Sequence, residues 1–177
     1  LLPTKQGLGF AALLLVILLG AINYNNSMAF MLAFLLGSVA MVSVLHTYTN
    51  LAGLRIRPVG AEPCFVGGHA LFFLQLSHSA KRPRLDISLD ADLGASAVAN
   101  VDAGQVSRVE LAVPANKRGR MRLGRVVVAT RYPLGLFRAW SLLDVNAEAV
   151  IYPKPSAKAP PPPASPERGG QQPVAEA

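Results

Sequence analysis

The stretch that decides the fold reads LGFAALLLVILLGAI over Leu8–Ile22, then NYNNS, then AFMLAFLLGSVAMVSVL over Ala29–Leu45. No Lys, Arg, Asp or Glu lies between Lys5 and Arg55. Charged side chains are almost never fully buried, so the surface of a soluble domain carries them at short intervals. A charge-free stretch of this length therefore excludes an ordinary soluble globular domain for this part of the chain.

Each apolar run has about the length that crosses a bilayer. A hydrocarbon core about 30 Å thick takes about 20 apolar residues, with about 17 near the lower limit. Inside it, backbone polar groups must be paired within the segment, so each run is expected to be a helix. The polar segment Asn23–Ser27 reverses the chain. We therefore expect a transmembrane hairpin over residues 1–50, with spans at about 7–23 and 28–47. Small residues are expected at the contact between the spans: Gly20, Ala21, Gly37, Ser38 and Ala40.

Three alternatives fit this region less well. A cleaved signal peptide has one apolar run of about 7–15 residues, whereas here a second run follows at once. A buried soluble hairpin needs further helices to cover it, and the rest of the chain has the pattern of strands. A single long helix is disfavoured by Asn23, Asn25 and Asn26 together.

The flanking charges predict an orientation. Lys5 precedes the first span, Arg55 and Arg57 follow the second, and the turn has no basic residue. Because cytoplasmic flanks are enriched in Lys and Arg, both termini are expected in the cytoplasm.

Residues 51–153 have the pattern of a β-rich domain. Apolar and polar residues alternate in short segments separated by Gly, Pro and Asn, which is typical of an antiparallel sandwich. About 100 residues is the size of an immunoglobulin-like domain, although the Cys–Trp–Cys pattern is absent. The fold expected is a membrane-anchored all-β protein. Seven strands are expected, at Leu54–Arg57, Ala70–Leu76, Leu85–Asp90, Val109–Val113, Arg120–Val128, Phe137–Leu143 and Ala149–Tyr152.

Residues 154–177 differ in composition from the rest. They hold half of the chain's 14 prolines, including the run Pro160–Pro163. Such a segment favours extended polyproline II and does not bury a core. It is expected to be a Pro-rich disordered linker or tail.

The chain has a net charge of +7, and its basic residues are most closely spaced in the segment 117–125. Apolar Met121 and Leu123 alternate with the arginines, which is typical of a strand with one solvated face. The alternatives are contact with anionic lipid or a partner and, least favoured, nucleic acid, because no aromatic residues are interleaved for base stacking. The basic residues are Lys117, Arg118, Arg120, Arg122 and Arg125.

No catalytic, cofactor or metal site is predicted, and the chain is not expected to be an enzyme. Asp86, Ser88 and Asp90 superficially resemble a metal-binding D-x-S-x-S loop, but Ile87 and Leu89 between them favour plain strand alternation. The three histidines have no ligand spacing. A single cysteine excludes an intramolecular disulfide.

The string RYPLGLFRAW over Arg131–Trp140 predicts a turn between strands, because Pro fixes φ and Gly135 permits a positive φ. Leu136, Phe137 and Trp140 then supply large apolar area. We expect a core-forming corner, with a docking surface for a partner as the alternative.

That string, together with Arg118-Gly119-Arg120, the stretch His46–Leu54 (HTYTNLAGL) and Tyr152–Pro155 (YPKP), resembles the bacterial "domain of unknown function 58" family. The resemblance covers residues 3 to about 155. It implies a two-helix anchor in the inner membrane, then a β-sandwich, then a von Willebrand A-like domain that these 177 residues do not contain. It also implies an accessory role beside MoxR-type AAA+ ATPases and other membrane proteins in assembling or maturing proteins.

The expected function is accordingly a non-enzymatic membrane anchor and protein-interaction module. Its expected partners are the lipid bilayer and, through the resemblance, a MoxR-type ATPase, and no nucleic acid. The alternative is an electrostatic binder of anionic lipid headgroups or nucleic acid through the segment 117–125.

Overall fold

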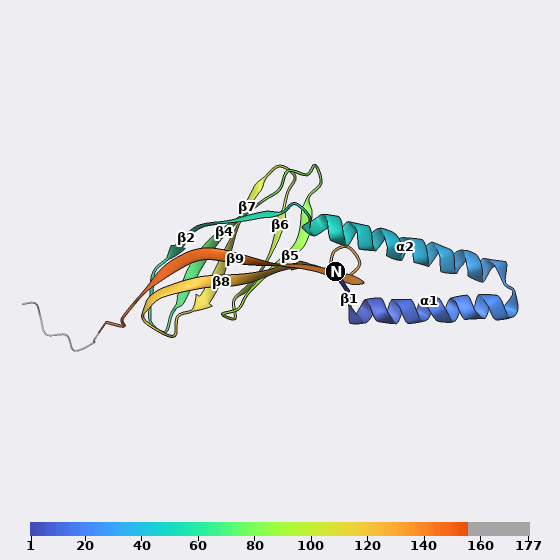
Figure 1. The fold of residues 1–177 in the computed structure, drawn as a ribbon, viewed down its shortest axis with the longest axis horizontal. Helices are drawn as coiled ribbons and strands as arrows, with labels where there is room; N and C mark the ends of the chain where they lie inside the picture. Colours follow the sequence, from blue (N-terminus) through green and yellow to red (C-terminus); the bar gives the residue numbers. More distant parts are fainter. Residues whose placement is uncertain (156–177) are drawn as a thin grey trace, which may run out of the picture.

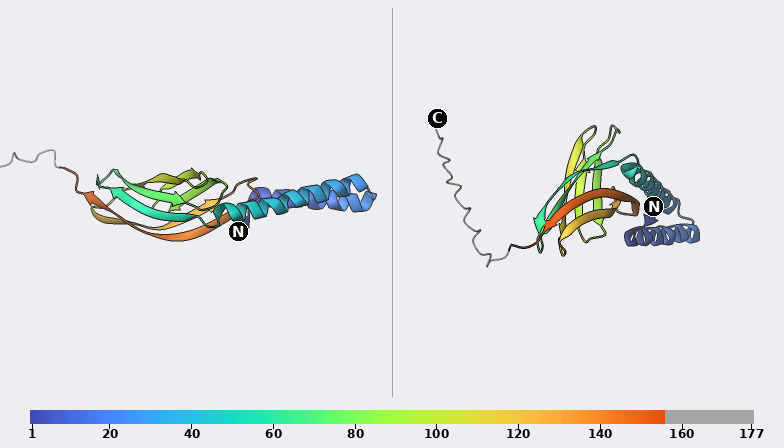
Figure 2. Two further views of the ribbon diagram at one scale, coloured as in Figure 1. Left: turned by 90° about the horizontal axis from the view of Figure 1, so that it is seen from above. Right: turned by 60° about the vertical axis from the view of Figure 1, so that its left-hand side comes forward.

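The structure, a computed structural model, describes residues 1–155 and consists of a helix pair followed by two packed β-sheets (Figure 1). The helices are α1 (Lys5–Tyr24) and α2 (Ser27–Leu51). Both are long and apolar enough to cross a membrane. They run side by side and project from one end of the sheets, as the two further views also show (Figure 2).

The turn between the helices is shorter than the five residues predicted. Asn25 ends α1 with φ 47°, a left-handed conformation that asparagine tolerates. The Asn26 side chain then begins α2 by accepting hydrogen bonds from the backbone N–H groups of Met28 (3.0 Å) and Ala29 (3.3 Å). The two asparagines thus reverse the chain alone, and the flanking polar residues Tyr24 and Ser27 belong to the helices.

Small side chains lie in the contact between the helices, in part as predicted. Ala21 and Ala33 are buried, and Gly37 faces the Leu14 side chain, where a Cβ would make an ordinary contact at 3.8 Å. Gly20, by contrast, faces open space. Small residues let the two backbones approach. Leu14 also lies in this contact, whereas most of the other large apolar side chains point outward.

The sheets are antiparallel except for one short parallel pairing, β3 with β9. The larger sheet has the order β1-β9-β8-β5-β6, with β3 also on β9, and the smaller one has the order β2-β4-β7. The strands are β1 (Leu2–Pro3), β2 (Arg55–Glu62), β3 (Cys64–Phe65), β4 (His69–Ser77), β5 (Arg84–Ala91), β6 (Ser96–Val101), β7 (Val106–Pro114), β8 (Gly119–Thr130) and β9 (Phe137–Tyr152).

The strand prediction was incomplete in two ways. The segments Phe137–Leu143 and Ala149–Tyr152 are parts of one strand, β9, rather than two strands. Their continuity follows from strict alternation, because every second residue from Leu143 to Ile151 faces the core. The strands β1, β3 and β6 were not predicted at all.

The core lies between the sheets and is built by the inward-facing residues of each strand. Phe72, Leu74 and Leu76 of β4 and Leu111 of β7 are fully buried in the smaller sheet. They meet inward-facing residues of the larger sheet: Ile87, Leu89, Leu123, Val126 and Val128. The predicted Pro-rich tail lies outside the described residues from 156 onward.

The two ends of the sheets differ in what they adjoin. Where β8 ends at Thr130 and β9 begins at Phe137, the sheets meet the helix pair, and we call this the helix end. Where β8 begins at Gly119 and β9 ends at Tyr152, no helix is near, and we call this the far end (Figure 1). Every candidate site belongs to one of these ends.

Candidate functional site: the joint between the helix pair and the sheets

A buried polar network joins α2 to the larger sheet at the helix end. The Asn50 Nδ2 group donates to the Leu85 carbonyl (2.7 Å) and to the Thr130 hydroxyl (2.8 Å). The Asn50 Oδ1 atom accepts from the Leu85 backbone N–H (3.1 Å). Asn50 and Thr130 are buried, so these bonds have no competition from water. They fix the last turn of α2 to the start of β5 and the end of β8.

Thr47 adds a second attachment one turn earlier on α2. Its hydroxyl lies 2.8 Å from the Tyr132 carbonyl and 2.8 Å from the Ser43 carbonyl. The first contact ties α2 to the turn that joins β8 to β9, and the second is the usual bond of a helical threonine to the preceding turn. Thr47 is fully buried.

Arg84 closes the end of α2. Its guanidinium donates to the carbonyl of Thr49 and, at 3.0 Å, to that of Ala52. Carbonyls in the last turn of a helix have no partner within the helix, so an arginine there satisfies them. Burial lowers the pKa of Arg84 from its usual value, because the charged form is less well solvated there.

The start of α1 packs against the turn between β8 and β9. The Thr4 backbone N–H donates to the Leu136 carbonyl (3.0 Å), and the Thr4 hydroxyl donates to the Gly135 carbonyl (2.6 Å). Gly7 lies so close that a Cβ there would be 2.1 Å from the Leu136 oxygen. Both helices therefore attach to the same turn, and β1 pairs with β9 beside it.

The structure separates the three apolar residues of this turn. Leu136 is buried at 8% exposure, beside the start of α1. Phe137 is half-buried, and Trp140 is 49% exposed. Trp140 lines a cavity of about 460 Å³ between the end of α2 and the larger sheet, together with Tyr48 and Leu143. Of the three, Trp140 is the one whose side chain is open to a partner or a lipid.

The strings His46–Leu54 and Arg131–Trp140 meet at this joint. The sequence predicted no contact between them and singled out neither Asn50 nor Thr47. Their pairing partners lie far along the chain, so no local pattern connects them. The one signal in the sequence for these two residues was that they are polar and lie near the end of an apolar helix.

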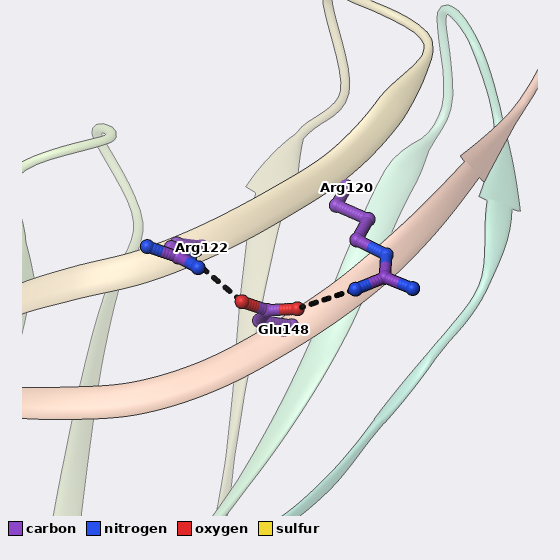
Figure 3. A network of polar contacts seen from close by, with 3 residues as sticks. All are labelled: Arg120, Arg122 and Glu148. Atoms are coloured by element: carbon purple, nitrogen blue, oxygen red, sulfur yellow. Dashed lines mark hydrogen bonds and ion pairs between the residues drawn. The ribbon is translucent and has the colours of Figure 1, made fainter.

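The predicted basic segment begins at the far end, in the loop before β8, and continues along the first half of that strand. Glu148 on β9 pairs with Arg122 (2.7 Å) and Arg120 (3.9 Å), as Figure 3 shows. Arg125 pairs with Asp92 (3.4 Å). Within residues 1–155, Lys117 and Arg118 form no ion pair. The segment therefore presents two unpaired charges beside three paired ones.

The predicted absence of a metal site remains a prediction. Asp86 has φ 53° at an irregular step of β5, and it lines a surface cavity with Ser88, Asp90 and Arg131. Within the part of the chain that the structure describes, no three His, Cys, Asp or Glu residues gather closely enough to hold an ion.

Comparison with known proteins places the chain in no family. No family model matches it, and no curated protein matches it. Among solved structures, Pseudomonas fluorescens alkylpurine DNA glycosylase AlkC bound to DNA containing an abasic site analog is similar over 71% of this chain and 40% of that chain. The identity is 15% and the TM-score 0.28, too low for any inference about this chain.

Proposed function

We propose that the helix pair crosses a lipid bilayer and holds the sheets at its cytoplasmic face, so that the protein acts as a non-enzymatic anchor and interaction module. The observation that carries this is the outward-facing apolar surface of both helices. Val16 is 63% exposed, Phe34 70% and Met41 72%, whereas the buried residues between the helices, Ala21 and Ala33, are small. A core helix of a soluble protein would bury such side chains, whereas lipid tails solvate them.

Helix length and aromatic placement support the same proposal. The 20 residues of α1 correspond to about 30 Å, the thickness of a hydrocarbon core. Tyr24 lies at the tip of the hairpin, while Tyr48, Tyr132 and Trp140 lie around the joint, all with exposed rings. Trp and Tyr are enriched at both membrane–water interfaces.

The charge distribution supports a cytoplasmic location for the sheets. The tip around Asn25 carries no charge, and the basic residues lie on the side of the joint, beginning with Lys5 and Arg55. Under the positive-inside rule both termini then face the cytoplasm of a bacterial inner membrane.

The strand order supports an immunoglobulin-like sandwich. If β2 is named A and the following strands B, C, C′, E, F and G, omitting β3, the sheets read A-B-E and G-F-C-C′. Immunoglobulin-like sandwiches place A, B and E on one sheet and C, F and G on the other.

The resemblance to the domain of unknown function 58 family supports a more specific role. We infer that the sheets hold a partner, such as a MoxR-type AAA+ ATPase, near the membrane. A membrane-bound module raises the effective concentration of whatever else is bound there, so a weak second contact forms readily.

Cysteine accessibility tests the topology. In a Cys64→Ser background, Asn25→Cys places a thiol at the hairpin tip, and Ser79→Cys places one on an exposed loop of the sheets. We expect an impermeant maleimide to label the tip in spheroplasts and the loop only after lysis. Alkaline extraction that releases the chain from membranes, or labelling of both thiols in spheroplasts, would refute the proposal.

The alternative proposal is an electrostatic surface formed by the segment 117–125. Lys117 and Arg118, both exposed and unpaired among the described residues, favour it. The length of β8 separates them from the joint, so they lie away from a membrane that the helices cross, and a soluble anionic partner fits them better than lipid. Liposome and oligonucleotide binding over a salt series tests this. Binding that survives replacement of Arg118, Arg120, Arg122 and Arg125 by Gln would exclude it.

A further inference from the structure

A second basic cluster lies at the helix end, in the loop that follows β4 and in the first residue of β5; we call residues 80–84 together loop 80–84. It contains Lys81, Arg82 and Arg84. Together with the last turns of α2 and Tyr132, this loop lines a surface cavity of about 550 Å³ that is open to solvent on one side. No Asp or Glu is among the described residues that line the cavity. Its positive charge is therefore not neutralised from within, unlike that of the arginines that pair with Glu148.

The C-terminal end of α2 lies beside this cavity, and its unpaired carbonyls would repel an anion if nothing covered them. The C-terminal end of a helix carries a partial negative charge on its unpaired carbonyls. Here the Arg84 guanidinium covers the carbonyls of Thr49 and Ala52. Lys81 and Arg82 are exposed and make no ion pair within residues 1–155, so both can turn toward a bound anion.

The cavity lies at a defined depth along α2. From Ser27 to His46, which forms part of its wall, the helix rises about 30 Å. That rise equals the thickness of a hydrocarbon core. If the helices cross the bilayer, the cavity opens where the phosphates of the cytoplasmic leaflet lie. Trp140 and Tyr48, exposed around the same joint, fit this level.

We propose that this cavity binds a phosphate group, carried by an anionic phospholipid of the cytoplasmic leaflet, with Lys81 and Arg82 as its charged contacts. The inference rests on the proposed membrane insertion and adds a specific ligand to it. A guanidinium and an ammonium at one site suit a phosphate, because both form charge-assisted hydrogen bonds to its oxygens. Basic pockets beside membrane helices on the cytoplasmic side recognise lipid headgroups in this way.

The test compares two double variants of the full chain purified in a non-ionic detergent. Lys81→Gln with Arg82→Gln removes two charges at the cavity, and Lys117→Gln with Arg118→Gln removes the same two types of charge at the far end. Arg84 is left intact because it holds the joint. The probes are phosphatidylglycerol, phosphatidylcholine and inorganic phosphate, and native mass spectrometry measures the bound fraction.

The wild-type chain and the far-end variant are expected to bind phosphatidylglycerol equally and phosphatidylcholine weakly. The cavity variant should bind phosphatidylglycerol about 25-fold more weakly, since each of the two basic residues near an anionic surface contributes about fivefold. Unchanged binding in the cavity variant, or an equal loss in both variants, would overturn the site. Inorganic phosphate that binds as tightly as the lipid would overturn the assignment to a lipid.

Alkaline extraction of the same variants distinguishes a failure of the proposed membrane anchor from a failure of the proposed phosphate-binding cavity. A chain that extraction releases refutes the anchor. A chain that stays in the membrane, with lipid binding indifferent to Lys81 and Arg82, refutes only the cavity. Thermal unfolding of each variant shows whether lost binding reflects lost folding.

Discussion

Large apolar side chains point outward in the helix pair and inward in the sheets. Phe34 on α2 is 70% exposed, whereas Phe72 on β4 is fully buried. The same residue type thus has opposite surroundings within one chain. In the sheets, removing apolar area from water stabilises the fold. In the helix pair, small residues and partly buried ones such as Leu14 form the contact, and most of the large residues remain free to meet lipid. The four predictions below test this contrast and the joint between the two regions.

The largest effect is expected from shortening a phenylalanine inside the sheets. Phe72→Ala should lower the free energy of unfolding by about 3–5 kcal/mol, because it leaves a cavity in a close-packed core. Phe34→Ala, the matched change on the helix surface, should lower it by less than about 1 kcal/mol. Urea unfolding in detergent, followed through the fluorescence of the single tryptophan, measures both. Equal losses would show that Phe34 is part of a packed core after all.

The polar joint should be the next most sensitive place. Asn50→Ala leaves the backbone N–H of Leu85 without its partner and leaves the Leu85 carbonyl with only the weaker bond from the Thr130 hydroxyl (3.4 Å), which costs about 1–3 kcal/mol. Thr49→Ala, at the exposed neighbouring position, is the control and should change stability little. Both are measured by the same urea unfolding. If Asn50→Ala is as stable as the control, the network does not hold the two regions together.

An effect of similar size is expected where α1 approaches the turn between β8 and β9. Gly7→Ala places a methyl group against the backbone oxygen of Leu136, so α1 must shift, at a cost of about 1–3 kcal/mol. Gly9→Ala meets no atom and should leave stability unchanged or slightly higher. Thermal unfolding compares the two variants. An unaffected Gly7→Ala variant would mean that α1 is not held at this turn.

The smallest effect is expected at the far end. Glu148→Gln removes the partner of Arg120 and Arg122, which are 82% and 77% exposed, and should cost no more than about 1 kcal/mol. The loss should vanish at high salt, which screens exposed charges. Asp102→Asn, exposed and outside the ion pairs of residues 1–155, is the control. A loss that persists at high salt would indicate a structural role for Glu148.

The helices were predictable from sequence because their signal is local. The absence of charge over two spans can be recognised without knowing the fold. Asn25 and Asn26 indicate where the chain reverses, because asparagine is favoured at helix ends. The long strands were predictable for the same reason, since alternation of large and polar residues marks an inward face. β6 was missed because its sequence SAVANV alternates with small residues, which give a weak contrast.

The joint was not predictable, because its residues are partners across the fold. Nothing near Asn50 indicates Leu85 or Thr130, and nothing near Lys81 indicates that α2 lies beside it. The position of the segment 117–125 depends on the direction in which β8 pairs with β9. Charge density alone favoured the segment 117–125 as a contact for lipid or a partner. In the fold, however, loop 80–84 is the basic cluster that lies beside the helices.

Both helices attach to the turn from which β9 begins, so a movement of the helix pair is transmitted along β9. Its 16 residues reach roughly 50 Å from the joint to the far end, at about 3.3 Å per residue. Because Thr4 and Thr47 fix the helices to the turn at its base, a tilt of the helix pair by about 10° would move the far end by roughly 9 Å. In the proposed arrangement, a change in the bilayer that tilts the helix pair would move the far end of the sheets relative to a partner bound there. The sheets themselves would not change their internal structure.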